Sequence, residues 1–376
     1  MEYSIDSFLP EIIKLREHIH TYPEISYEEY ETTKLIEETI TSSQLEFKKF
    51  SKLKTGGYCD VGEGETIVFR ADIDALPITE NPENKVVSKN HGIMHACGHD
   101  YHTAIGLGLL KYFGANKINK KLRVVFQPAE EAAPGGAESV IAENILDKTK
   151  CAIALHVDPK LPVGKFDVID GAVQASTTSI KIELTGPGGH TSKPAETVDL
   201  INVTSYYVVQ IQSYLRQNID PRETLAFAFG AINGGTTHNT IPEKISLRGT
   251  IRTHNNEVLD KCFNLMKSFT KNFSELNGIK INIEFPTSCP ATINNSELTK
   301  SFINFMKNTG REENLILAAK PSMGADDFAF YGLKLPSLYL QVGAGGKGSL
   351  HTTDLELDDE VLRVSLETLI DFFEQY

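Results

Sequence analysis

TIVFRADIDALPI, at residues 66–78, begins as a short apolar run rich in β-branched residues and continues into acidic side chains. Similar apolar runs occupy residues 122–126 and 152–155, and residues 102–113, between the first two runs, have helical periodicity. Alternation of short buried strands with helices is typical of an α/β fold with a mostly parallel sheet. We predict such a fold, preceded by two helices that Pro23 separates, because the residue before a proline disfavours helical geometry.

A different pattern begins near Thr178 and defines a second part of the chain. The segments after it read in order as strand (SIKIELT), helix, strand, strand, a long helix at 257–277 and a final strand (IKINIEF). The order β-α-β-β-α-β is that of a ferredoxin-like module. We therefore predict an inserted α+β domain at residues 179–287 and a larger domain formed by residues 1–178 and 288–376.

The composition is that of a soluble globular protein and argues against some classes of partner. Hydrophobic residues make up 40% and charged residues 23% of the 376-residue chain, so it can bury a sizeable core. The 37 basic and 50 acidic residues give a net charge of -13. Nucleic acids and anionic membranes bind basic surfaces, so neither is an expected partner. Metal ions suit an acidic chain better.

The N-terminal segment and the cysteines predict a cytoplasmic protein. MEYSIDSFLP contains acidic residues and does not resemble a signal peptide. No stretch approaches the roughly 18 apolar residues of a membrane-spanning helix. Scattered cysteines indicate a reducing compartment rather than a disulfide framework. The five are Cys59, Cys97, Cys151, Cys262 and Cys289.

The segment HGIMHACGHDYHTA, residues 91–104, is the densest group of chemically reactive side chains. Cys97 and His99 flank Gly98, and a thiolate and an imidazole at this spacing can face one metal ion or a metal pair. Glycine permits the tight backbone that such an arrangement needs. A solvated histidine-rich loop is the alternative, because short motifs often match by chance.

Carboxylates and another histidine follow the other predicted strands. Adjacent Glu130 and Glu131 end the segment VVFQPAEE, and His156 follows another apolar run. Asp72 and Asp74 lie in ADID. Ligands of open α/β sheets bind beyond the carboxyl ends of the strands, so these side chains are expected in one crevice. Paired glutamates are also common on solvated helices, but here one can bind metal while the other transfers protons.

Further motifs occur in order along nearly the whole chain. They are LREHIHTYPEISYEE, FRADIDALPI, MHACGHDYHTA, VVFQPAEE, ALHV, GPGGHTSKP, NTIP, LRGTIRT and LHTTDLELDDE. In these motifs the sequence resembles the amidohydrolase branch of the zinc-type aminoacylase and carboxypeptidase superfamily. That branch includes hippurate hydrolases, indole-acetyl-amino-acid hydrolases and N-acetyldiaminopimelate deacetylases. The resemblance implies a zinc-peptidase-like catalytic domain and an inserted domain that serves as a lid and in dimerisation.

Carried over by position, the resemblance implies a site for two metal ions in which Cys97 bridges both. Glu131 and His351 complete the ligands of one metal. His99 and His156 complete those of the other. Thiolate, imidazole and carboxylate ligands suit zinc, and manganese and cobalt also accept them. The expected cofactors are therefore two divalent ions of zinc, manganese or cobalt per subunit.

The same resemblance implies roles for the other acidic residues. Glu130 is the general base, which takes a proton from the attacking water and passes it to the leaving nitrogen. Asp74 orients a metal ligand. Asp72 stands where the peptidase branches have a metal-binding histidine, and we interpret it as structural. Relatives have glutamate then aspartate where this chain has Asp326 and Asp327, which leaves the role of Asp326 open.

In the inserted domain the resemblance singles out three residues. His190, in GPGGHTSKP, is implied to reach across a dimer interface and donate to the oxyanion of the tetrahedral intermediate. Asn239 and Arg252 are implied to bind the substrate carboxylate, a group that arginine recognises well. An exposed strand residue is the alternative for Arg252. The resemblance thus implies a homodimer formed through the inserted domain, and a closed state in which His190 reaches the reacting carbonyl.

The predicted activity is hydrolysis of the amide bond of small N-acyl amino acids, with Glu130 as base, and N-acetyldiaminopimelate is one substrate that fits. The same metal chemistry would support a dipeptidase or a carboxypeptidase. By resemblance, the Cys-Gly-His pair and the absence of histidine from ADID favour the amidohydrolase branch. A non-catalytic metal-binding scaffold is a third hypothesis, because a fold alone does not establish function. The presence of Glu130 beside a full ligand set argues against it.

Overall fold

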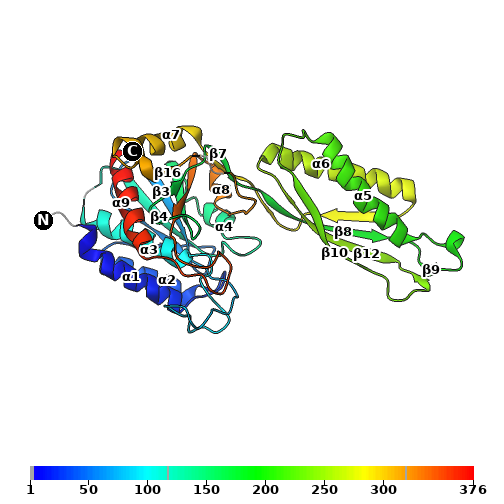
Figure 1. Cartoon of the computed structure of the whole chain (residues 1–376), viewed down its shortest axis with the longest axis horizontal. Coiled ribbons are helices and arrows are strands. Elements are labelled where there is room, and N and C mark those ends of the chain that lie inside the picture. The colour runs from blue at the N-terminus through cyan, green and yellow to red at the C-terminus, as the bar shows by residue number, and fades with distance from the viewer. Residues whose placement is uncertain (1–3, 117, 318–319) are drawn as a thin grey trace. The chain divides into compact units, whose positions relative to one another are not determined.

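The computed structural model describes residues 4–116, 118–317 and 320–376 (Figure 1). The chain forms two compact units, each with its own hydrophobic core. Unit 1 comprises Met1–Gly171, Ile293–Lys320 and Asp327–Tyr376, and unit 2 comprises Ala172–Thr292 and Pro321–Asp326. Among the described residues, no helix combines the length and the apolar character needed to cross a membrane.

Unit 1 is built on a mixed sheet, which has eight strands within the described residues, in the order β1-β2-β4-β3-β5-β17-β6-β16. The central strands β4, β3, β5 and β17 are parallel, and antiparallel pairs flank them. Every residue of β3 is buried, as expected for a parallel strand covered on both faces. The strands are β1 (Phe47–Lys49), β2 (Gly57–Val61), β3 (Thr66–Asp72), β4 (Lys121–Gln127), β5 (Thr149–Asp158), β6 (Phe166–Asp167), β16 (Leu315–Ile316) and β17 (Ser337–Gly343).

The long helix α3 (His99–Ala115) packs against β3 and β4, and α1 (Ile5–Thr21), α2 (Tyr30–Ser42) and α9 (Glu360–Gln375) pack against α3 (Figure 1). Further helices of unit 1 are α4 (Ala137–Ile141), α7 (Ser296–Asn308) and α8 (Ala329–Gly332). The predicted α/β fold and the two N-terminal helices are confirmed. The helix predicted at 102–113 begins earlier, at His99, directly after Gly98 in the left-handed conformation.

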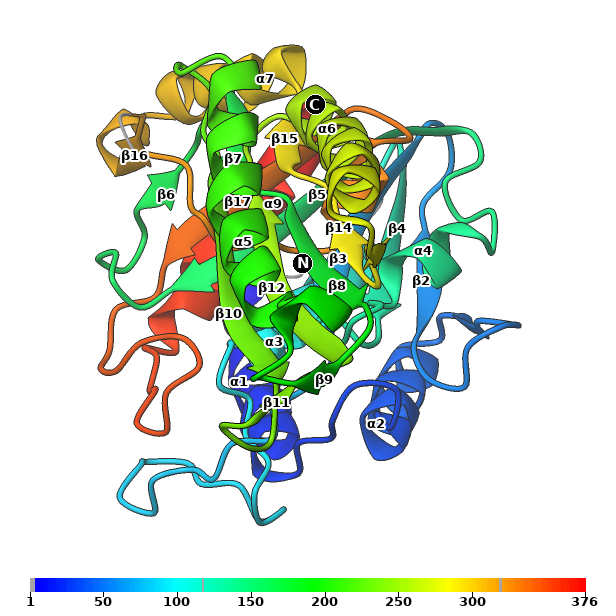
Figure 2. The same ribbon diagram turned by 90° about the vertical axis from the view of Figure 1, so that its right-hand side faces the viewer.

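Unit 2 contains an antiparallel sheet with the strand order β10-β12-β8-β13, and two helices cover one of its faces (Figure 1, Figure 2). In chain order its elements are β8 (Thr177–Thr185), α5 (Leu200–Asn218), β10 (Ala226–Gly234), β12 (Lys244–Arg252), α6 (Asn256–Asn277) and β13 (Lys280–Glu284). This is the element order that the sequence predicts. Shorter strands are β9 (Gly189–His190), β11 (Thr240–Ile241) and β14 (Ser288–Cys289). The strands β7 (Gly171–Gln174) and β15 (Thr292–Asn294) each contain residues of both units.

Local signals set the ends of the helices of unit 2. The Asp199 side chain accepts a hydrogen bond from the third residue after it at the start of α5, and Asn255 accepts one from Glu257 N–H at the start of α6. Gly278, at φ 62, ends α6, because glycine adopts the left-handed region without steric cost. Between the helices and the sheet, alternate residues of β8 point into the core.

Candidate metal centre

The carboxyl ends of β3, β4 and β5 lie at one edge of the sheet of unit 1, because these strands are parallel and adjacent. Glu130 and Glu131 follow β4, and His156 lies near the end of β5. His99 is the first residue of α3, and His351 lies in the loop between β17 and α9. Residues that are far apart in the sequence are thereby placed at the same edge.

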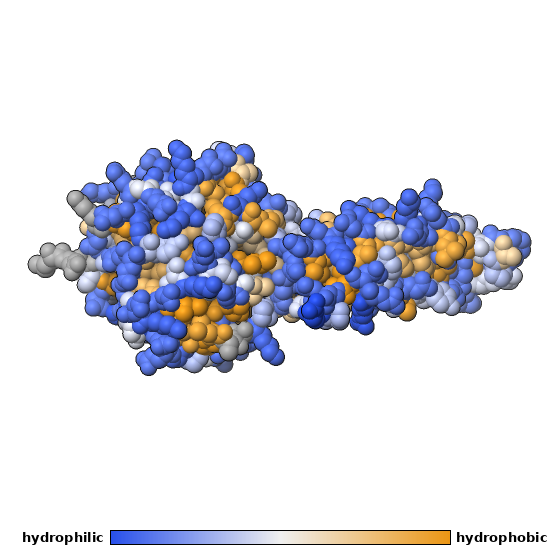
Figure 3. Space-filling model, turned by 90° about the horizontal axis from the view of Figure 1, so that it is seen from above, coloured by the Kyte–Doolittle hydropathy of each residue, from blue (hydrophilic) through white to orange (hydrophobic). Residues whose placement is uncertain are grey.

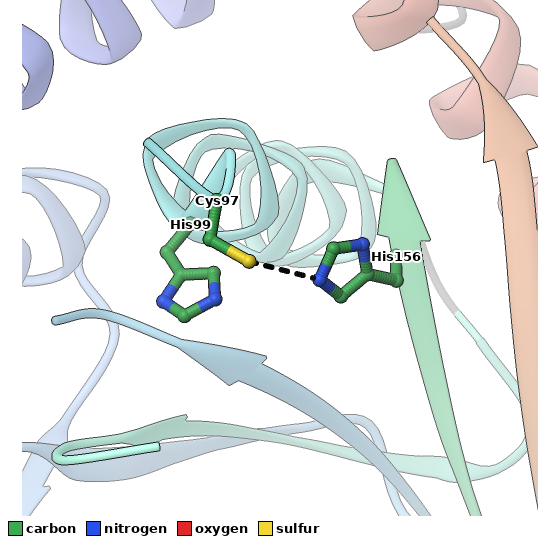
Figure 4. A group of neighbouring side chains, drawn as sticks. All are labelled: Cys97, His99 and His156. Atoms are coloured by element: carbon green, nitrogen blue, oxygen red, sulfur yellow. Dashed lines mark hydrogen bonds between the residues drawn. The ribbon is translucent and has the colours of Figure 1, made fainter. Parts of the chain in front are cut away.

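The sulfur of Cys97 belongs to two groups of candidate ligands. The ligand atoms of Cys97, His99 and His156 lie within 4.8 Å of one another, and so do those of Cys97, Glu131 and His351. Cys97 Sγ is 3.5 Å from His156 Nε2 (Figure 4) and 3.3 Å from His351 Nε2. His351 Nε2 is 3.2 Å from Glu131 Oε1. Two ligand groups that share one sulfur could hold two metal ions.

Hydrogen bonds to backbone carbonyls orient two of these histidines. His99 Nδ1 is 2.9 Å from the carbonyl oxygen of Asp74, and His156 Nδ1 is 2.8 Å from that of Val157. A carbonyl oxygen only accepts, so Nδ1 carries a proton in both rings. Each ring, when neutral, therefore presents the lone pair of Nε2, which is the form that binds metal. Burial lowers the pKa of His156 to about 3 and keeps that ring neutral.

Two residues next to the Cys97 sulfur, Gly98 and His351, have left-handed backbone conformations. Gly98, between two candidate ligands, has φ 83, and a Cβ there would lie 2.4 Å from a methyl group of Val157. Glycine is therefore required for both conformation and space. His351 has φ 64, which costs a non-glycine residue about 1–2 kcal/mol. Its N–H donates to the Ala96 carbonyl at 2.7 Å, which fixes the loop beside the cysteine.

The buried polar atoms of this site fit a cation. Among the residues that the structure describes, His99 Nε2 is buried without a hydrogen-bond partner, and the buried Glu131 Oε1 has His351 Nε2 as its neighbour at 3.2 Å. A buried nitrogen is costly to leave unpaired, and coordination to metal would satisfy His99 Nε2. Burial holds the pKa of the Cys97 thiol well above its ordinary value, and Asp72 and other neighbours raise the pKa of His99 against the effect of its burial. Metal binding must therefore displace protons, so affinity should decrease as the pH falls.

Asp74 connects two of the candidate ligands. Its Oδ2 accepts from the N–H of Glu131 at 2.9 Å and from the hydroxyl of Ser26 at 2.6 Å. Its backbone carbonyl accepts from His99. Burial would raise the pKa of Asp74, but the bonds from His99, Ser26 and the Glu131 N–H lower it. The ionised carboxylate thus fixes the backbone of one candidate ligand close to the ring of another.

Asp72 accepts hydrogen bonds from Arg70 and from His102, whose Nδ1 is 2.6 Å from Asp72 Oδ1. The other ring nitrogen of His102 accepts from Val157 N–H at 3.0 Å, directly after His156. Although burial opposes it, Arg70 and nearby imidazoles hold the pKa of Asp72 well below its ordinary value. Sequence reasoning assigned no role to Arg70 or His102. The available signal was a charged residue inside a strand that is otherwise apolar.

Asp326 and Asp327, which stand where relatives have glutamate then aspartate, have different environments. Asp327 Oδ1 accepts from Arg70 Nη2 and from Gln127 Nε2, each at 2.7 Å, and Asp327 Oδ2 accepts from the Ala137 N–H at 3.0 Å. It therefore joins β3, β4 and the start of α4. Asp326 belongs to unit 2 and is buried.

Two of the residues predicted in unit 2 are neighbours. Asn239 and His190 lie on adjoining segments, because Thr191 N–H donates to the Asn239 carbonyl at 3.2 Å and His190 pairs with Thr240. His190 is exposed, and its Nδ1 accepts from the N–H of Ser192 at 3.1 Å. In the neutral ring the proton is then on Nε2, which can act as a donor.

The third residue, Arg252, lies elsewhere in unit 2. It is the last residue of β12, which begins at Lys244, so the length of the strand separates Arg252 from the segment of His190 by about 25 Å. Arg252 Nη1 donates to the Met323 carbonyl at 2.7 Å. A small substrate therefore cannot contact His190 and Arg252 of the same unit 2 at once.

Two candidate ligand groups that share Cys97, with Glu130 beside them at the carboxyl edge of the sheet, are the arrangement that a metal-dependent hydrolase of amide bonds needs. The sequence model of peptidase family M20/M25/M40 matches residues 68–375. The chain therefore belongs to this family.

Individual relatives agree with this assignment. N-acetyl-L-cysteine deacetylase of Bacillus subtilis (strain 168) is 33% identical over 94% of this chain and 85% of its own length. N-acetyldiaminopimelate deacetylase of Shouchella clausii (strain KSM-K16) is 32% identical over 96% of this chain and 97% of its own. A solved structure from Bacillus subtilis, described as a dinuclear metal binding peptidase of the M20 family, has a TM-score of 0.86 and 29% identity, covering 99% of both chains.

Replacing Cys97 with alanine should lower bound metal from two ions per chain to at most one, because both ligand groups lose their shared sulfur. Metal content after zinc reconstitution and gel filtration measures this. Cys59→Ala is the matched control, since Cys59 is also buried in unit 1 but belongs to neither group. Retention of two tightly bound ions by Cys97→Ala would contradict the shared-sulfur arrangement.

Proposed function

We propose that this enzyme removes the acyl group from small N-acyl amino acids, with N-acetyl amino acids such as N-acetyldiaminopimelate as substrates. The observation that carries the proposal is the position of Glu130, whose carboxylate lies 3.9 Å from His99 Nε2 beside the two ligand groups that share Cys97. The two curated relatives act, by their names, on N-acetylated amino acids and align with more than nine-tenths of this chain.

Cys97 would be common to both metals, Glu131 and His351 would hold one of them, and His99 and His156 the other. This assignment is supported by the two ligand groups and by the unpaired buried Nε2 of His99. When bound, the metals would supply Lewis acidity that activates water and polarises the amide carbonyl. Zinc, manganese and cobalt all accept this mixture of ligands.

Glu130 would act as the general base. It belongs to neither of the two ligand groups that contain Cys97, but its carboxylate lies 3.9 Å from His99 Nε2, beside the position where the metals would be held. It would accept a proton from the attacking water and deliver it to the nitrogen of the departing amino acid. Asp74 would hold Glu131 and His99 in place during this step.

We further propose that unit 2 is a ferredoxin-like lid and dimerisation domain, with unit 1 as the catalytic domain. The strand order β10-β12-β8-β13 leaves β10 at an edge of the sheet, where another chain could pair with it. Helix α5 exposes apolar side chains: Ile201, Tyr206 and Val209 are 53%, 59% and 64% exposed. Figure 3 looks onto the side of unit 2 that carries the helices in Figure 1, and apolar surface is visible there.

A homodimer would also account for the separation of the predicted substrate residues. Because one small substrate cannot contact both ends of β12, Arg252 and His190 would serve the same site only if they came from different subunits. Asn239 would accompany His190, and Arg252 would bind the carboxylate of the substrate. The free donor on Nε2 of His190 would stabilise the oxyanion.

We also infer a cytoplasmic location, supported by cysteines that are free throughout the described residues, including buried Cys59, Cys151 and Cys262. Fractionation of cells that produce the protein tests this. Recovery in a secreted or periplasmic fraction would contradict it.

Reconstituted enzyme should release free amine from N-acetyl amino acids, including N-acetyldiaminopimelate, and a chelator should abolish this turnover. The measurement is amine release from a panel of N-acetyl, N-benzoyl and dipeptide substrates with zinc, manganese or cobalt. Cleavage of dipeptides alone would identify a dipeptidase. Absence of turnover despite two bound metals would favour the non-catalytic scaffold.

Glu130→Gln should retain both metals and lose about 100- to 10,000-fold in kcat, because the amide cannot accept the proton. Glu131→Gln provides the contrast, since its expected effect is loss of metal. Metal content and steady-state kinetics on the best substrate distinguish the two variants. Unchanged kcat in Glu130→Gln would refute the assigned base.

His190→Ala and Glu130→Gln should each be inactive alone and recover about a quarter of wild-type activity when co-expressed. Half of the dimers are then mixed, and each mixed dimer contains one complete site. Light scattering gives the oligomeric state of the same samples. A monomeric mass, or dimers without recovery, would contradict a histidine supplied by the second subunit.

A further inference from the structure

The turn that carries Glu130 begins with a residue in an unfavourable backbone conformation. Ala129 has φ 57 and is fully buried, directly after Pro128 and directly before Glu130. A residue with a Cβ rarely adopts this left-handed region, so contacts around it must hold it there. Rotation of the backbone at Ala129 changes the direction of every atom that follows. The position of Glu130 therefore depends on what fixes Ala129.

A buried carboxylate from another part of the sequence bonds to this residue. Glu29, which is 0% exposed, accepts from the Ala129 N–H at 2.8 Å through Oε1. The same oxygen accepts from the Tyr27 N–H at 2.9 Å, and Oε2 accepts from the Thr55 hydroxyl at 2.7 Å. All three partners donate, which is the arrangement that an ionised carboxylate needs in order to remain buried. A second bond holds the turn from the other side, where Gly136 N–H donates to the Ala129 carbonyl at 2.9 Å.

The segment of Glu29 contacts the site at a second point. Ser26 donates to Asp74 Oδ2, the oxygen that also accepts from the Glu131 N–H. The loop between α1 and α2 is thus connected to both neighbours of Glu130. Glu29 bonds directly to Ala129, and Ser26 is linked to Glu131 through Asp74.

We propose that Glu29 is a positioning residue for the reaction: by holding Ala129 in the left-handed conformation, it aims the carboxylate of Glu130. This inference rests on the proposed role of Glu130 as base. Burial raises the pKa of Glu29 to about 7, against the hydrogen bonds that lower it, so the carboxylate is kept at this position at an energetic cost. Such costly buried groups occur more often at functional sites than in ordinary cores.

Glu29→Gln tests the inference, because an amide has a single acceptor oxygen without charge and forms weaker bonds to N–H groups. We expect kcat to fall by about 100-fold at full metal occupancy. KM should change by less than about threefold, since the substrate-binding residues are untouched. Hydrogen exchange at the Ala129 amide should become faster in the metal-free protein as well, which is a measurement independent of activity.

Glu24→Gln is the matched control. Glu24 lies in the same loop, and its carboxylate accepts from the N–H groups of Glu31 and Thr32. Within the described part of the chain, this carboxylate makes no hydrogen bond to the turn of Glu130. It should reduce thermal stability and leave kcat, per metal-loaded enzyme, unchanged. If Glu29 only stabilised the fold, both variants would lower stability and neither would lower kcat.

Ala129→Val provides a second approach if Glu29→Gln does not accumulate as folded protein, since a β-branched residue strongly disfavours the left-handed region. The same fall in kcat with unchanged KM is expected. A kcat within about twofold of wild type, in either folded variant with two metals bound, would overturn the inference. Lack of turnover by the wild-type enzyme would instead refute the proposed function. Hydrogen exchange at the Ala129 amide would then decide whether Glu29 holds this residue.

Discussion

The sulfur of Cys97 has to stay within reach of two separate groups of side chains, and the surrounding structure is arranged around this requirement. His99 and His156 come from α3 and β5, while Glu131 and His351 come from loops. Parallel strands end at a common edge, and this geometry brings the four elements to the sulfur. Gly98 adds the sharp backbone turn without which the cysteine and the following histidine could not face the same space.

Hydrogen bonds within the protein orient several of these candidate ligands. The Nδ1 atoms of His99 and His156 donate to backbone carbonyls, and Asp74 connects the Glu131 backbone to the loop between α1 and α2. Behind them, Arg70 donates hydrogen bonds to Asp72 and Asp327. Buried networks of this kind are strong when complete and costly when a partner is missing. The candidate ligands are therefore oriented by the fold, and the proton displacement expected on metal binding would arise mainly at Cys97 and His99.

Much of the fold follows from patterns in the sequence, because β3 is a buried apolar run and the helices of unit 2 have clear periodicity and capping residues. The close approach of Glu131 and His351 could be expected only from the resemblance to a known family, since 220 positions separate them and no local pattern records the contact. Glu29 and His102 could not be assigned from sequence. A glutamate in an acidic loop and a histidine on a helix are usually solvated, and only the folded chain places them against Ala129 and Val157.

The central claim is that two metal ions share Cys97. Anomalous diffraction at the zinc edge, from crystals of the zinc-reconstituted enzyme, tests it most directly. The account predicts two peaks per chain, both at about 2.3 Å from the Cys97 sulfur, one beside His99 and His156 and the other beside Glu131 and His351. A single peak, or two peaks of which only one lies at bonding distance from this sulfur, would contradict it.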